Sequence, residues 1–250
     1  MTAAALAVLA LAGCVDLTTD PDEIVAIEFS PLPYPAVVLG DTLRDSLGVA
    51  APLVGKLFNG SGDLATKPAP TFVSLDTIVD VTATGMLVAH QTVGTARLIA
   101  TGGGLQSVSR SVETTLLPDT LSIEAGPDTL PLSIPDDAAS NISTEFRLKL
   151  QSRAGGGVVR SWVVDFALRY RSQDIAPKDT SLLYLANEVG RPSAVDTTDG
   201  SGVVSRRLRF KVVAGQVPVL DSVIVVARAM YRGALVPGAP ARMVVRVKPK

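Results

Sequence analysis

The side chain with the most distinctive chemistry is the thiol of Cys14, the only cysteine among the 250 residues. It follows an uncharged apolar stretch, Ala3 to Leu11, and two small residues, Ala12 and Gly13. That stretch is too short to span a bilayer, which requires about 20 apolar residues. A short apolar segment followed by small residues is typical of a secretory signal and its cleavage site. The sequence therefore predicts an exported chain that is cut close to Cys14.

The run Leu11, Ala12, Gly13, Cys14 resembles the lipobox of bacterial lipoproteins. The resemblance implies that residues 1–13 are a signal peptide and that Cys14 carries the lipid attachment to a membrane. Two or more acyl chains make such anchoring stable, since each buried CH₂ contributes about 0.8 kcal/mol. Residues 1–13 contain no Lys or Arg, so either the true start lies upstream or the signal is atypical. The alternative is a short buried apolar segment with an incidental cysteine.

Other residues with reactive side chains point to ordinary structural roles. His90 is the only histidine, so a Ser/His/Asp triad would have to use it, and no His-rich metal site can form. Asp196, Asp199 and Gly200 could indicate a calcium loop, but their spacing does not match an EF-hand ligand series. Asp and Gly are common in turns, so we predict a turn there.

The glycine runs do not predict a nucleotide site. Gly102 to Gly104 and Gly155 to Gly157 lack the GKS/T or GxGxxG context of phosphate-binding loops, and hairpin tips explain them better. Once Cys14 is acylated, no thiol remains for a disulfide, a metal site or a nucleophile. We therefore predict no catalytic residue, no cofactor and no metal site.

Basic residues in the outward phase of three expected strands form the most specific candidate site. These residues are Arg147, Lys149, Arg169, Arg171, Arg207, Arg209 and Lys211. If the three strands are neighbours, they form a basic sheet face that attracts an anionic envelope glycan or protein partner. The alternative is a solvated face whose Arg stems cover apolar surface. No nucleic-acid partner is predicted.

The charge is unevenly distributed along the chain, whose net charge is −1. Residues 14–24 carry four acids and no base, residues 25–117 five bases and seven acids, and residues 118–250 eighteen bases and thirteen acids. An acidic tether, a near-neutral first half and a basic second half indicate three units. A boundary near Pro118 separates the second unit from the third.

The elements that must position these residues are strands. From Ile24 onward, short apolar runs are broken by Gly, Pro, Asp and Asn, which is typical of an all-β sandwich or barrel. The clearest alternation lies at residues 161–171, in the second half of the chain. One face of this expected strand would be lined by Trp162, Val164, Phe166, Leu168 and Tyr170. This phase predicts that Trp162 is a core residue rather than a sugar-stacking platform.

Residues 25–117 resemble a bacterial immunoglobulin-like domain of the group-2 type. The matching pieces, in order, are Gly40, Asp41 and Thr42; Ser74 and Asp76; Val79 and Val81; Gly85, Leu87 and Ala89; Gly94, Thr95 and Ala96; and Ile99 and Ala100. Phe72 stands where the family usually has Trp. Residues 197–203 with Leu208 and Phe210, and residues 221–227, resemble more loosely a group-1 immunoglobulin-like domain, and a fibronectin-like sandwich would satisfy the same pattern.

Together these observations predict an all-β protein of two antiparallel immunoglobulin-like β-sandwich domains after a cleaved lipoprotein signal peptide. The predicted units are residues 1–13, a lipidated acidic tether at 14–24, and domains at 25–117 and 118–250. The predicted function is non-catalytic: a lipid-anchored surface or periplasmic binding, adhesion or spacer module in a bacterial cell envelope, at the outer membrane or cell surface rather than the inner membrane. The alternatives are an accessory subunit of a larger envelope assembly and, disfavoured, a hydrolase.

Overall fold

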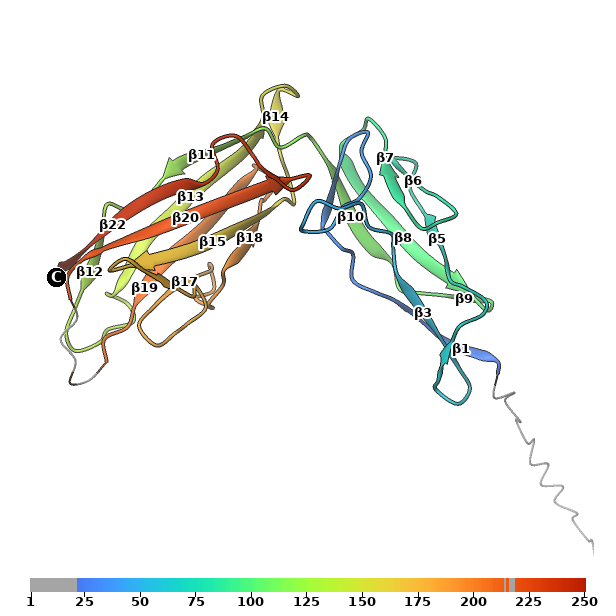
Figure 1. The fold of residues 1–250 in the computed structure, drawn as a ribbon, viewed down its shortest axis with the longest axis horizontal. Helices are drawn as coiled ribbons and strands as arrows, with labels where there is room; N and C mark the ends of the chain where they lie inside the picture. Colours follow the sequence, from blue (N-terminus) through green and yellow to red (C-terminus); the bar gives the residue numbers. More distant parts are fainter. Residues whose placement is uncertain (1–21, 214, 216–218) are drawn as a thin grey trace, which may run out of the picture.

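Strands make up all the regular structure in the computed structural model, which describes residues 22–213, 215 and 219–250 (Figure 1). The predicted fold class, all-β with two antiparallel immunoglobulin-like β-sandwiches, is confirmed for these residues. In this part of the chain no helix is long and apolar enough to cross a membrane. The predicted signal peptide and the lipid site at Cys14 lie outside the described residues.

The first half of the chain packs two sheets face to face, with a small hairpin beside them. One sheet has the order β1 (Ile24–Phe29), β3 (Gly55–Asn59) and β4 (Leu64–Ala65). The other has the order β2 (Ala36–Val38), β10 (Arg110–Thr115), β8 (Gly94–Gly102) and β5 (Thr71–Ser74), with β9 (Leu105–Gln106) on β8. The hairpin pairs β6 (Val79–Val81) with β7 (Leu87–Ala89), and Gly85 in its turn has φ +78°.

The second half is a larger sandwich. Its smaller sheet has the order β11 (Thr120–Ala125), β13 (Ile142–Ser152), β19 (Val203–Phe210) and β17 (Leu183–Ala186), with β14 (Gly157–Val158) on β13. Its larger sheet has the order β12 (Thr129–Leu132), β22 (Ala241–Pro249), β20 (Ser222–Tyr231), β15 (Val163–Tyr170) and β16 (Gln173–Ile175). To this larger sheet β18 (Val195–Thr197) and β21 (Ala234–Leu235) add short pairings.

The first two strands and the last strand of each half are arranged in the same way. The opening strand, β1 or β11, pairs antiparallel in one sheet, and the next strand, β2 or β12, crosses to the other sheet. There it pairs parallel with the last strand of its half, β10 or β22. These two parallel pairs tie the start of each half to its end, so the sandwich is closed by contacts between residues distant in sequence.

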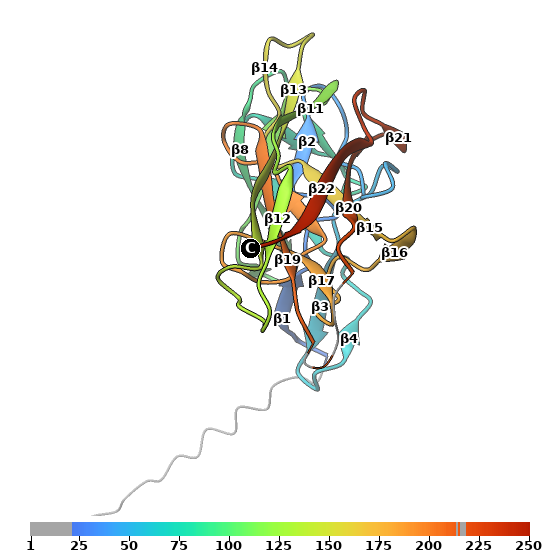
Figure 2. The same cartoon turned by 90° about the vertical axis from the view of Figure 1, so that its left-hand side faces the viewer.

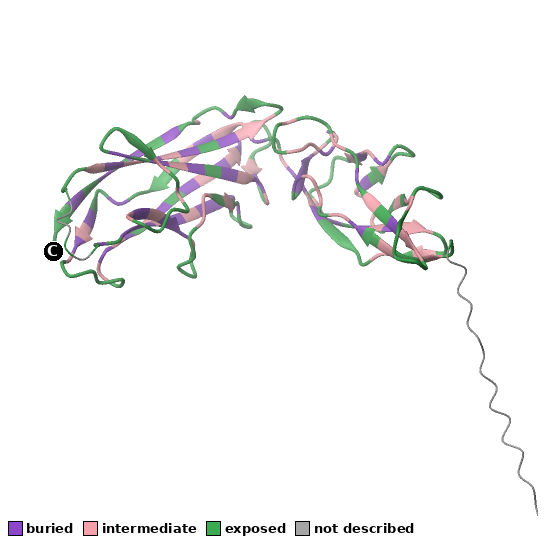
Figure 3. Ribbon diagram, turned by 60° about the horizontal axis from the view of Figure 1, so that its bottom comes forward, coloured by how far each residue is buried: buried purple, intermediate pink, exposed green. Residues whose placement is uncertain are grey.

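The core lies between the two sheets, as the alternating buried and exposed stripes of Figure 3 show. Trp162 and the four inward residues of β15 are each at most 5 % exposed, which confirms the predicted phase. Burying one such side chain stabilises the fold by roughly 1.5–3 kcal/mol. With few aromatic residues available, most of the core consists of Val, Leu and Ala.

The two halves meet near the predicted boundary at Pro118. No sheet among the described residues contains strands from both sides of it. The connection from Thr115 to Thr120 is short, and Asp119 accepts hydrogen bonds from the backbone amides of Arg153 (2.8 Å) and Ala154 (2.9 Å). Because no strand pairing crosses this boundary, we expect each half to fold independently.

Candidate functional site: a junction and a buried arginine

The predicted basic face does not form as one surface. Arg147 and Lys149 in β13 and Arg207 in β19 share the outer face of one sheet. Arg169 in β15 and Arg171, just after that strand, belong to the opposite sheet of the sandwich. The two outer faces of a sandwich point away from each other, so the structure does not bring the seven bases together.

Carboxylates neutralise most of the bases on the β13–β19 face. Arg147 pairs with Glu124 at 3.2 Å, and Arg207 pairs with Glu145 at 2.6 Å. Arg209 is only 5 % exposed, because it pairs at 2.8 Å with Asp136 in the segment that covers this sheet. Lys149 and Lys211 are the remaining bases of this group. This face therefore shows less free positive charge than the sequence predicts.

A second arginine of β19 points into the sandwich instead of out of it. Arg206 has the same phase as the buried Leu208 and Phe210 and is 5 % exposed. Its guanidinium lies 5.8 Å from the ring centroid of Phe166 in the opposite sheet. Arg206 was not identified as a buried residue from the sequence, although its phase with Leu208 and Phe210 could have indicated this.

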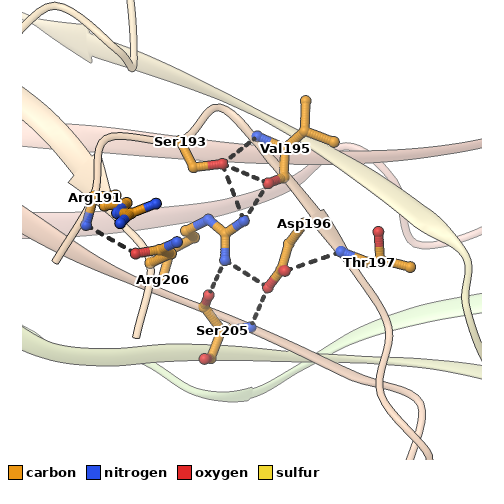
Figure 4. Close-up of polar contacts among 8 residues, drawn as sticks. Arg191, Ser193, Val195, Asp196, Thr197, Ser205 and Arg206 are labelled. Atoms are coloured by element: carbon orange, nitrogen blue, oxygen red, sulfur yellow. Dashed lines mark hydrogen bonds and ion pairs between the residues drawn. The ribbon is translucent and has the colours of Figure 1, made fainter. Parts of the chain in front are cut away.

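Arg206 is held by a polar cage built from β18 and the loop before it (Figure 4). Its Nη1 lies 2.7 Å from Asp196 Oδ2 and donates at 2.7 Å to the carbonyl oxygen of Ser205. Its Nη2 donates to the carbonyl of Val195 and, at 3.3 Å, to Ser193 Oγ. Asp196 also accepts the amide of Ser205 at 2.9 Å. Because β18 belongs to the larger sheet and β19 to the smaller, this ion pair joins the two sheets.

The second cluster, which we call the junction, lies where the two halves of the chain touch, and its centre is the carboxylate of Asp41. Arg44 binds both carboxylate oxygens at 3.0 Å. From the second half, Tyr231 Oη donates at 2.7 Å, and Arg232 donates at 3.2 Å and 3.0 Å. Asp41 is 8 % exposed, so this buried acid of the first half is paired with residues 190 and 191 positions further along the chain.

Aromatic rings form the apolar part of the junction. Tyr34 of the first half lies 4.9 Å from Trp162, and Trp162 lies 6.0 Å from Tyr231, between ring centroids. The hydroxyl of Tyr34 accepts the amide of Val163 at 2.9 Å, and Trp162 Nε1 donates to the carbonyl of Met230 at 3.1 Å. Each polar tip is paired while each ring is packed, which is how buried Tyr and Trp are usually accommodated.

Backbone also meets backbone across the junction. Gly48, with φ +83°, lies so close to Arg232 and Gly233 that a Cβ on it would stand 2.1 Å from the amide nitrogen of Gly233. Arg44 Nη1 donates to the carbonyl of Gly48 at 3.0 Å. A pocket of ≈ 20 Å³, enough for about one water molecule, is lined by residues of both halves, including Tyr34, Arg44 and Tyr231.

The electrostatics of the junction favour an ionised Asp41. Burial by itself would raise the pKa of this carboxyl, but hydrogen bonds from Arg44, Arg232 and Tyr231 outweigh it and hold the pKa well below its usual range. Burial, followed by the hydrogen bond to Asp41, raises the pKa of Tyr231 to about 12. Neither group exchanges protons near neutral pH, so the cluster holds position rather than transferring protons.

Acid is expected to loosen the junction. A folded-state pKa below the unfolded value means that the stabilisation is present above about pH 4 and is lost as the pH falls through the folded-state pKa. We expect the radius of gyration from small-angle scattering to be constant from about pH 7 to about pH 4 and to rise below that. Asp41→Asn should already show the larger radius at neutral pH. A variant with the parent's dimensions at neutral pH would contradict this role of Asp41.

The other candidate residues have local roles. His90 is exposed, with Nε2 2.7 Å from Asp80 Oδ2, and that hydrogen bond raises its pKa. Asp199 accepts the amides of Ser201 and Val203 in a turn, as predicted for this segment. Within residues 22–213, 215 and 219–250, no group of three or more His, Cys, Asp or Glu side chains is placed to hold a metal ion.

Comparisons with known proteins give low similarity. No protein-family model and no curated protein matches the chain. Among solved structures, it is similar to the adhesin InvE of Yersinia pseudotuberculosis (13 % identity, TM-score 0.36, 86 % of this chain and 56 % of that one). It is also similar to the Escherichia coli adhesin FdeC (12 %, 0.33, 92 % and 65 %) and to domains 4 and 5 of the S-layer protein SbsC (13 %, 0.30, 91 % and 98 %). The chain thus spans less than two thirds of either adhesin structure, and at these scores the similarity adds no argument about function.

Proposed function

We propose that the chain is a non-catalytic, lipid-anchored module of a bacterial cell envelope that acts as a rigid spacer or adhesion module. The junction is the observation that carries this proposal. Domains joined by a linker are expected to move relative to each other unless their interface is large and apolar. Here a buried carboxylate, three aromatic rings packed at tilted angles and a close backbone contact join the halves.

Rigidity matters for a module that must hold its far end away from a surface. In Figure 1 the C-terminal end of β22 and the start of β1 lie at opposite ends of the molecule. A chain attached at its N-terminus would therefore present the second half outward. Flexible joints shorten the mean reach of a linked pair, and a fixed junction preserves it. The sequence supports attachment at Cys14 through the lipobox resemblance.

The anchor is tested by the mass of the protein made in its own host. We expect residues 1–13 to be absent and Cys14 to carry acyl chains, with the protein in the membrane fraction. The control, Cys14→Ser, removes the acceptor thiol and should leave the protein in the soluble fraction. An unmodified Cys14 with Met1 still attached would overturn the anchor and the envelope location that depends on it.

A further inference from the structure

The last strand, β22, carries a stripe of bases on its outer face. Arg242, Val244, Arg246 and Lys248 are exposed, whereas Met243, Val245 and Val247 between them are at most 6 % exposed. No acid occurs in this strand. We call the four exposed residues the β22 stripe; sequence reasoning had not selected them, although their alternation is visible.

The neighbouring strands do not neutralise the stripe. Figure 2 shows β22 between β12 and β20. On β20, Ser222 lies opposite Arg246, Ile224 opposite Val244 and Val226 opposite Arg242. On β12, Thr129 lies opposite Arg246. Arg242, Arg246 and Lys248 make no ion pair with any residue that the structure describes, so their charges are available.

Four acids share this outer face with the stripe. Asp165 stands opposite Arg228 in the pairing of β15 with β20, and Asp174 lies 3.8 Å from Arg169. Asp128 lines a hollow with Val244, Arg246 and Lys248, and Asp221 lines a second one with Val244, Arg169 and Arg171. The face holds six bases, namely Arg169, Arg171, Arg228, Arg242, Arg246 and Lys248, against these four acids.

Two shallow hollows lie beside the β22 stripe, and Val244 lines both of them. The first, of ≈ 530 Å³, is lined by Asp128, Thr129, Val244, Arg246 and Lys248. The second, of ≈ 350 Å³, lies between β22 and the turn after β15, and is lined by Arg169, Arg171, Ser172, Asp221, Ser222, Ile224 and Val244. An extended chain lying on this face would meet bases on both sides of an apolar strip.

We propose that the β22 stripe binds an extended acidic polysaccharide. Outward side chains on one strand repeat every ~6.8 Å, so Arg246 and Lys248 can meet successive charges of an extended polymer. Arg binds carboxylate and sulfate groups through its planar fork of donors. The position of the stripe on the outward half, which rests on the proposed function, favours an envelope polymer over the protein's own membrane.

The composition of the face disfavours other partners. Protein interfaces usually depend on buried aromatic anchors, and the exposed residues of the stripe and its β20 neighbours include none. Single-stranded nucleic acids likewise stack on aromatic side chains. Binding would be mainly electrostatic and should weaken as salt rises, because the Debye length falls to about 3 Å at 1 M.

Binding of the purified full chain to immobilised alginate at low and high salt tests the proposal, with neutral dextran as the blank. The triple variant Arg242→Gln, Arg246→Gln, Lys248→Gln should lose at least about tenfold in affinity, since one base near an anionic surface contributes roughly fivefold. The matched control Arg147→Gln, Arg207→Gln, Lys149→Gln removes the same three charges from the opposite sheet and should lose clearly less. All six positions face solvent or are half-buried, so both variants should keep the parent's melting temperature.

Three results would overturn the proposal: no salt-sensitive alginate binding by the parent chain, equal losses in both variants, or a melting temperature lowered in the stripe variant enough to explain its loss. Tighter binding to polyglutamate, single-stranded DNA or anionic phosphatidylglycerol vesicles than to alginate would reassign the stripe to that partner class. These outcomes are independent of the acylation state of Cys14, so failure of this proposal and failure of the anchor can be told apart.

Discussion

Replacing Asp196 by Ala is expected to lower the free energy of unfolding by about 3 kcal/mol, because removing one partner of a buried ion pair leaves an uncompensated charge in the core. The charge left behind is that of Arg206, whose side chain is 5 % exposed and packs on Phe166. The same change also removes the acceptor for the Ser205 amide. Urea denaturation of parent and variant measures the difference.

The matched control is Asp174→Ala, which breaks the exposed pair with Arg169. The side chains of that pair are 55 % and 92 % exposed, so the change should cost less than about 1 kcal/mol. Equal losses in the two variants would show that the Arg206 ion pair contributes no more than a surface pair. Arg206→Met with Asp196→Ala should recover part of the loss, since no buried charge then remains unpaired.

Replacing Gly48 by Ala is expected to separate the two halves while leaving each one folded. The added Cβ would stand 2.1 Å from the backbone nitrogen of Gly233. The backbone of one or both halves must move to remove this steric clash. We expect a larger radius of gyration by small-angle scattering and a broader distribution of molecular dimensions. The far-ultraviolet circular dichroism should stay that of an all-β chain.

Gly62→Ala separates this steric effect from backbone strain. Gly62 also has φ +83°, but no atom lies within 4 Å of the position of its Cβ. Both variants should therefore carry the left-handed backbone cost of roughly 1–2 kcal/mol, and Gly48→Ala alone should change the shape of the molecule. An unchanged radius of gyration in Gly48→Ala would mean that the junction accommodates the added Cβ while the two halves stay in contact. The rigid-spacer proposal would then lose its main support.

The strand phases could be predicted from the sequence because they depend on local geometry. Successive side chains of a strand point to opposite faces, so Trp162 and the alternating residues up to Tyr170 identify the buried side without knowledge of any partner strand. The all-β class follows from the same pattern and from the turn residues between runs. The triplet Asp-Thr-Leu occurs at Asp41, Asp119 and Asp128. The second and third triplets directly precede or open β11 and β12, whereas the first precedes no strand.

The site could not be predicted, because it depends on which strands become neighbours. The period of two assigns Arg169 and Arg207 to outward faces, and only the pairing of β15 with β20 and of β13 with β19 places them on opposite sheets. Arg209 was read as outward, and the segment that carries Asp136 covers it. For these residues the predicted outward phase was correct, but the prediction that they share one exposed surface was wrong.

The sequence by itself determined that this chain is built of strands, which sides of those strands are apolar, and where a segment that resembles a lipobox stands. Only the tertiary structure decided that Asp41 meets Tyr231 and Arg232, that Arg206 crosses between sheets, and that the bases on the outer face of β22 have no acid opposite them. The reason is physical. Alternation is enforced by the backbone within a few residues, whereas ion pairs and junctions form between residues brought together by the packing of the whole chain, and a local pattern does not encode that packing.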